Sequence, residues 1–180
     1  AAVDAASKGD TVLVASGVYN VGTTVTPGYS SLNRVVIDKH ITVRSAYRWG
    51  AVISGGSKAE RIRCVYMSAG SLEQFVLRGG YTAETGNNLF DRSGGGVRVV
   101  TGHGTGMVED CKIENCTAEY RGGGAYGGSL RSCTLVGNAA PTGAGLASAV
   151  ASDCVVSNNT ATAAGGGSYA GRLTDCTILH

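Results

Sequence analysis

Apolar and polar positions in the second half of the chain follow a repeat with intervals of 22, 21 and 22 residues. Each copy contains a cysteine, one intervening residue and an aliphatic residue, and later a glycine cluster. Alternation along a strand points the first and third of these side chains into the fold and the middle one into water. A repeat this short is too small for a helical hairpin and predicts one coil of a β-solenoid. The four segments are Cys111-Lys112-Ile113, Cys133-Thr134-Leu135, Cys154-Val155-Val156 and Cys176-Thr177-Ile178.

Coils stacked in register place equivalent side chains about 4.8 Å apart, so the repeat predicts ladders of like residues. We expect Cys111, Cys133, Cys154 and Cys176 to form one such ladder. Asn138 and Asn159 are expected at a corner, because asparagine tolerates left-handed backbone angles and its side-chain amide can bond the next coil. The polar residue before each repeat cysteine is expected to bond neighbouring backbone at a bend. These residues are Asp110, Ser132, Asp153 and Asp175.

The same template extends less regularly toward the N-terminus. Residues 72–80 match it with Phe75 in the cysteine position, and an insertion at residues 81–93 separates this coil from the next glycine cluster. The alanine-rich start predicts a short helix that caps the first coil. We therefore expect one domain over residues 1–180, with a cap at 1–10, irregular coils over 11–100 and regular repeats over 101–180.

The last residues stop in mid-coil, four positions after Cys176 and before the expected corner. We therefore expect the chain to be a fragment of a longer protein. An open last coil presents unpaired backbone groups. If the protein ends here, this edge predicts end-to-end self-association through the C-terminal coil.

Two groups of residues bear a resemblance to known proteins. The run Gly9-Asp10-Thr11-Val12-Leu13-Val14-Ala15-Ser16-Gly17-Val18-Tyr19 resembles the first coil of parallel β-helix proteins in the pectate-lyase-like superfamily. The later coils, with Gly122-Gly123-Gly124-Ala125 and Val156-Ser157-Asn158-Asn159, are similar to bacterial surface β-helices such as polymorphic outer-membrane proteins. The resemblance implies an all-β, right-handed, single-stranded parallel β-helix with three sheets per coil, and an extracellular or bacterial cell-surface location.

The amino-acid composition limits the classes of partner that we expect. Glycine at 29 of 180 residues, 43% hydrophobic and 16% charged residues describe a folded, turn-rich β protein. The net charge is +2, and no Lys or Arg cluster interleaves with aromatic residues, so we expect no nucleic-acid partner. No apolar run approaches the roughly 20 residues that span a bilayer, so no membrane span is expected.

The six cysteines allow a disulfide or a thiol interpretation. Equivalent side chains in stacked coils lie farther apart than the Cβ separation of about 3.8 Å that a disulfide favours. We therefore expect the four repeat cysteines to be buried thiols that serve as small hydrophobes. The pair Cys111 and Cys116 has no second pair at similar spacing and no adjacent histidine, so no metal site is predicted.

Residues that break the repeat are the candidates for a ligand site, because a site converges once whereas structural residues recur. They lie mainly in the insertion and on nearby strands, and loops on a rigid scaffold often hold binding residues. An ordinary solvated loop is the alternative. The candidates are Arg78, Glu84, Asn87, Asn88, Asp91, Arg92, Arg98 and His103.

Two functions follow from these observations. The favoured one is a non-catalytic extracellular stalk or adhesin-like scaffold whose partner is a polysaccharide or a host-surface glycan, without a cofactor. The alternative is a polysaccharide lyase or glycoside hydrolase with its site near residues 81–93. A lyase needs a base and a cation such as calcium, and a hydrolase needs two carboxylates. Clustering of Arg78, Asp91, Arg98 and His103 on one face would favour the enzyme, and dispersal would favour the scaffold.

Overall fold

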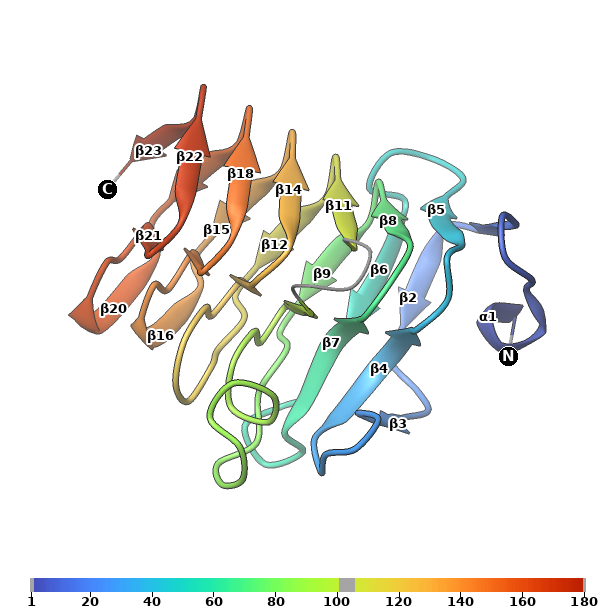
Figure 1. Ribbon diagram of the computed structural model, residues 1–180, viewed down its shortest axis with the longest axis horizontal. Helices are drawn as coiled ribbons and strands as arrows, with labels where there is room; N and C mark the ends of the chain where they lie inside the picture. Colours follow the sequence, from blue (N-terminus) through green and yellow to red (C-terminus); the bar gives the residue numbers. More distant parts are fainter. Residues whose placement is uncertain (1, 101–105, 180) are drawn as a thin grey trace.

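The computed structural model describes residues 2–100 and 106–179. It is a parallel β-helix: the coils stack along the long axis, and their strands form three sheets of seven strands that run along this axis. The two ends of the chain lie at opposite ends of the stack (Figure 1). The predicted all-β solenoid and its short N-terminal helix, α1 (Ala2–Ala5), are therefore confirmed. Among the residues described here, no helix is long and apolar enough to cross a membrane.

Each of the five middle coils contributes one strand to each sheet, and neighbouring strands pair in parallel, except that β3 (Thr24–Val25) pairs antiparallel with β4 (Leu32–Ile37) in the first coil. Sheet A contains β1 (Thr11–Val14), β5 (Thr42–Ser45), β8 (Ser71–Glu73), β11 (Met107–Glu109), β14 (Ser129–Arg131), β18 (Val150–Ser152) and β22 (Arg172–Thr174). Sheet B contains β2 (Gly17–Tyr19), β6 (Ala51–Ser54), β9 (Val76–Arg78), β12 (Lys112–Glu114), β15 (Thr134–Val136), β19 (Val155–Ser157) and β23 (Thr177–Leu179). Sheet C contains β3 (Thr24–Val25), β4 (Leu32–Ile37), β7 (Ile62–Met67), β10 (Val97–Val99), β13 (Ala125–Tyr126), β17 (Leu146–Ala147) and β21 (Ser168–Tyr169). A further pair, β16 (Ala139–Thr142) and β20 (Thr160–Ala164), extends one corner.

The register stacks like on like in the interior. Ile113 pairs with Leu135, Leu135 with Val156 and Val156 with Ile178, so the aliphatic ladder runs along sheet B. Phe75, in the cysteine position of its coil, is buried and accepts a backbone hydrogen bond from Lys112 through its carbonyl. The core is therefore one continuous column inside the coils rather than a layer between separate elements.

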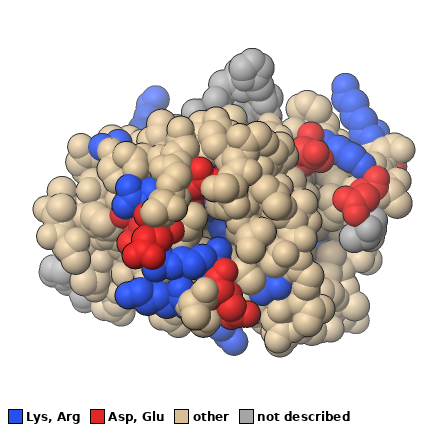
Figure 2. Space-filling view, turned by 90° about the horizontal axis from the view of Figure 1, so that it is seen from below, with Lys and Arg blue, Asp and Glu red and all other residues tan. Residues whose placement is uncertain are grey.

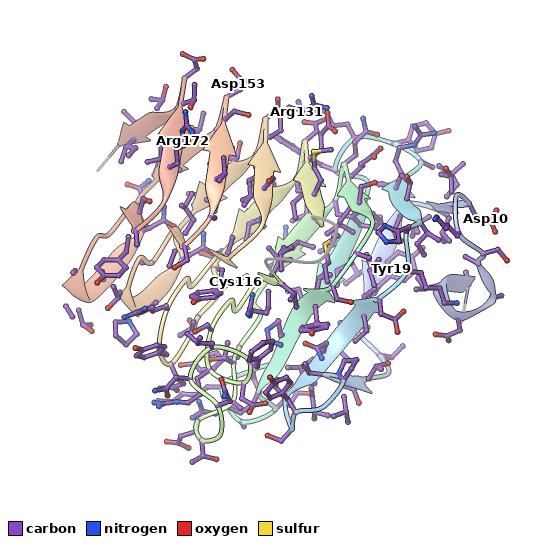
Figure 3. All side chains as sticks on the ribbon, viewed as in Figure 1. Asp10, Tyr19, Cys116, Arg131, Asp153 and Arg172 are labelled. Carbon is purple, nitrogen blue, oxygen red and sulfur yellow. The ribbon has the colours of Figure 1, made fainter. Side chains whose placement is uncertain are left out.

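The repeat cysteines are free thiols inside this column. Cys111, Cys133 and Cys154 are buried, and Cys176 in the last coil is half-buried. The Cys133 thiol donates to the carbonyl of Arg131 at 3.3 Å, and Cys116 likewise lies inside the coils (Figure 3). Burial raises the pKa of the Cys111 thiol to about 12. This thiol is therefore protonated at neutral pH and packs as a small hydrophobe.

The first corner of each regular coil is formed by the residue before the repeat cysteine. Asp110, Ser132, Asp153 and Asp175 have φ angles of 49°, 52°, 53° and 51°, in the left-handed region. Short polar side chains tolerate this conformation better than most residues do. The expected side-chain bond to neighbouring backbone is wrong for Asp110, whose carboxylate instead accepts from Nε of Arg48 at 2.8 Å.

The asparagine corner differs from the prediction in one respect. The left-handed residues are Asn115, Gly137 and Asn158, each one position earlier than the expected asparagine slot. The Asn138 side chain points inward instead, because its Nδ2 donates to Oδ1 of Asn159 and its Oδ1 accepts from the backbone N–H of Cys116. The predicted amide bonds between coils are thus present, but they bridge the interior and do not close a left-handed turn.

Candidate functional site

The insertion at residues 81–93 lies against the outer face of sheet C, near the start of β7 (Figure 1). It brings together five of the predicted ligand-binding residues: Asn87, Asn88, Asp91, Arg92 and Arg98. Most of their polar atoms are bonded within the protein. Oδ1 of Asn87 accepts from the backbone of Leu89 at 2.9 Å, and Oδ1 of Asn88 accepts from Nη1 of Arg92 at 2.7 Å.

Asp91 joins the insertion to the loop before β4. Its Oδ1 accepts from the backbone N–H groups of Ser30 at 3.0 Å and Ser31 at 2.9 Å, and its Oδ2 accepts from Asn87 at 2.8 Å. Burial alone would raise the pKa of this carboxyl, but these hydrogen bonds outweigh burial and lower the pKa. Asp91 is therefore ionised at neutral pH and committed to holding two loops together.

Arg63, which the sequence reasoning missed, is the buried anchor beneath the insertion. Its side chain is 0% exposed and donates to the carbonyls of Gly94, Phe90 and Ser93 at 2.8, 2.6 and 3.0 Å. Nη1 also donates to Oδ1 of Asn33 at 2.8 Å. Burial lowers the pKa of Arg63 to about 9, which leaves the guanidinium charged at pH 7. Every residue of β7 is buried, so alternation along this strand carried no signal that would single out Arg63.

Arg98 and aromatic rings form the next part of this face. The Arg98 guanidinium lies between the rings of Phe90 and Tyr126, 4.7 and 4.6 Å from their centroids. Phe90 in turn stacks on Tyr29 at 4.0 Å, and Nε of Arg98 donates to the carbonyl of Leu89 at 2.8 Å. Burial lowers the pKa of Arg98. The charge of Arg98 is thus enclosed by rings and carbonyls instead of being presented to a ligand.

One coil farther along, the Arg121 guanidinium packs against two tyrosine rings. Its guanidinium lies 4.7 Å from the Tyr120 ring centroid and 5.2 Å from that of Tyr169. Nε of Arg121 and Nε of Arg92 are the buried side-chain nitrogen or oxygen atoms that lack a hydrogen-bond partner within residues 2–100 and 106–179. An unpaired buried donor costs about 1–3 kcal/mol. We call the group formed by Arg92, Tyr120, Arg121 and Tyr169 the arginine–tyrosine corner.

Two of the remaining candidates, Arg78 and Glu84, are engaged in ion pairs. Arg78 is on sheet B, where its Nε contacts Oε1 of Glu114 at 2.6 Å, and Lys112 contacts Oε2 of the same carboxylate at 2.7 Å. Glu84 pairs with Arg61 at 3.3 Å, and Arg61 also bonds Glu119. His103 lies outside the described residues. Arg78, Asp91 and Arg98 are therefore dispersed over a surface ion pair, a loop clamp and a ring stack.

Five acidic side chains form ion pairs with Arg or Lys among the described residues: Glu84, Glu109, Asp110, Glu114 and Glu119. On the face in Figure 2, Lys and Arg side chains lie beside Asp and Glu side chains. Burial alone would raise the pKa of Glu114, but hydrogen bonds from Lys112 and Arg78 lower it. No group of three His, Cys, Asp or Glu side chains that could hold a metal ion occurs in the described part of the chain. This surface therefore carries guanidinium and aromatic groups beside paired carboxylates.

Comparisons with protein-family models, with curated proteins and with solved structures give no match to this chain.

Proposed function

We propose that this chain is a non-catalytic extracellular β-helix, a stalk or adhesin-like scaffold of the kind found on bacterial surfaces, whose outer face contacts a glycan. The observation that supports the proposal most strongly is that the Asp91 carboxylate is engaged in hydrogen bonds within the protein. It is the insertion's most buried carboxylate, and its three short hydrogen bonds all come from backbone N–H groups. A general base or a metal ligand needs a lone pair facing the substrate or the cation.

The distribution of the other polar groups supports the same function. A glycosidase requires two carboxyl groups about 5–10 Å apart with access to the sugar. Glu84 and Glu119 near the insertion both pair with Arg61, and Glu114 on sheet B is bonded by two cations. These contacts stabilise the coil surface and leave the carboxylates engaged. The continuous column of coils, by contrast, suits a rigid spacer.

The experiment for this proposal is a binding panel. The purified chain is passed over immobilised pectin, alginate, glycosaminoglycans and neutral glucans at physiological salt, and retention is measured on each surface. We expect reversible retention on at least one polysaccharide and unchanged retention after addition of EDTA. Absence of retention on every surface would refute the glycan-contact part of the proposal. Loss of retention with EDTA would contradict a cation-free scaffold and favour the calcium-dependent lyase alternative.

A further inference from the structure

We propose that the arginine–tyrosine corner binds an oxyanion carried by a saccharide, either a sulfate ester or a uronate carboxylate. The inference rests on the proposed glycan contact and specifies the chemistry of that ligand. It starts from the two guanidinium groups of Arg92 and Arg121, whose buried Nε atoms lack partners. Neither guanidinium has an ion-pair partner in the described part of the chain.

The two arginines are brought together by the coil register. Ser93 pairs with Arg121 across neighbouring coils, so the preceding residues, Arg92 and Tyr120, lie side by side. The backbone N–H of Tyr120 donates to the carbonyl of Arg92 at 2.9 Å. The Arg121 guanidinium lies over the Tyr120 ring, so both arginines adjoin the same tyrosine, Arg92 through its backbone carbonyl and Arg121 through its side chain. Arg92 and Arg121 thus carry positive charge on neighbouring coils, whose backbones lie about 4.8 Å apart, and a guanidinium binds an oxyanion through its N–H groups.

The nearby negative charge does not compensate this pair. Glu119 precedes Tyr120 in the chain, but its carboxylate bonds Arg61 on the other side. Among the described residues no side chain or carbonyl accepts from the Arg121 Nη groups, so they can donate to an external acceptor, and the rings of Tyr120 and Tyr169 hold the guanidinium in place. Pre-positioning of this kind lowers the entropy lost on binding. Arg92 is similarly fixed by its 2.7 Å bond to Asn88.

The tyrosines favour a saccharide as the carrier of the anion. Tyr169 is 36% exposed at the edge of the corner, and one side of its ring faces Arg121. A half-exposed ring beside a fixed cation offers an apolar surface for the C–H face of a sugar and a polar tip for its hydroxyl groups. The exposed residues Thr162, Ala163 and Ala164 next to it are small, so the approach is open.

The test measures the affinity of soluble oligosaccharides by calorimetry. Sulfated and uronate-bearing tetrasaccharides are compared with neutral tetrasaccharides on the native chain and on Arg121→Gln, Arg121→Lys and Tyr169→Ala. Arg172→Gln is the matched control, because Arg172 is an exposed arginine on β22 of sheet A (Figure 3). Circular dichroism and the melting temperature establish that each variant is folded. If Arg121→Gln fails to fold, Tyr169→Ala replaces it as the test of the corner, because Tyr169 is partly exposed.

We expect an acidic tetrasaccharide to bind and to lose tenfold or more in affinity in Arg121→Gln. Arg121→Lys should recover only part of that loss, since lysine keeps the charge but not the planar fork. Arg172→Gln should bind within about twofold of the native chain. Equal effects of Arg121→Gln and Arg172→Gln, or preference for neutral sugars, would overturn the oxyanion site and leave the glycan-binding scaffold intact. Absence of binding to every saccharide would instead refute the glycan contact itself, together with this inference.

Discussion

Replacing Arg63 by methionine is the most informative perturbation of this fold. Four of its hydrogen bonds are 3.0 Å or shorter, to the carbonyls of Gly94, Phe90 and Ser93 and to Oδ1 of Asn33. At about 1 kcal/mol of net stabilisation each, they contribute about 4 kcal/mol. Methionine fills similar space but donates nothing, and it also removes the cost of burying a charge. We therefore expect a net loss of about 3 kcal/mol in the free energy of unfolding.

The assay for Arg63→Met is urea unfolding followed by circular dichroism and by the fluorescence of the single tryptophan, Trp49. Arg172→Met is the control, because it removes an exposed arginine from the same kind of strand. Hydrogen exchange should also show faster exchange of the backbone amides in residues 87–93, which Arg63 holds against sheet C. If Arg63→Met is as stable as Arg172→Met, within about 0.5 kcal/mol, the anchor role is wrong.

Three further outcomes are expected. Asn138→Ala should lower the free energy of unfolding by about 2–3 kcal/mol, because it removes hydrogen bonds to Cys116, Ile113 and Asn159. A urea midpoint equal to that of the native chain would contradict this. The Cys111 thiol should stay unmodified by a thiol reagent at pH 8 until the chain unfolds, and peptide mass spectrometry measures this modification. Rapid labelling of Cys111 in the native chain would be inconsistent with a thiol pKa of about 12. Despite burial, hydrogen bonds lower the pKa of Asp91 from 3.8, so its stabilisation is full above pH 3.8 and is lost as pH falls through the lower folded value. Asp91→Asn should flatten this acid limb in pH-dependent melting, and an acid limb equal to that of the native chain would contradict this role.

The solenoid was predictable because its information is periodic. Cys111, Cys133 and Cys154 mark the same point of successive coils, and alternation around them separates buried from exposed positions without knowledge of the partner strand. At the asparagine corner the predicted left-handed backbone at Asn138 was wrong, whereas the predicted amide bond between coils was confirmed. Asn138 occupies the next position along from the left-handed residue Gly137, and both types are common at turns. Residue type alone does not say which of two adjacent residues, each common in turns, adopts the left-handed conformation.

Only the position of the insertion in the chain was predictable from the sequence. Its length and polarity marked residues 81–93, but the partners that use its polar groups are far away in the chain. Asp91 bonds Ser30 and Ser31, and Arg63 bonds Asn33 on one side and Gly94 on the other. These contacts occur once and leave no repeat in the sequence. Whether a polar residue binds a ligand or holds a loop therefore depends on tertiary contacts that periodicity does not encode.

The measurement that tests the central claim most directly is the length of polysaccharide chains after prolonged incubation with the protein. Pectin, alginate and glycosaminoglycans are incubated with the purified chain, with and without calcium, and their size distributions are followed by size-exclusion chromatography with light scattering. A non-catalytic scaffold predicts unchanged distributions for every polymer, including any polymer that the binding panel retains. Shortening of one polymer in proportion to protein concentration and time would contradict the scaffold and make the chain an enzyme.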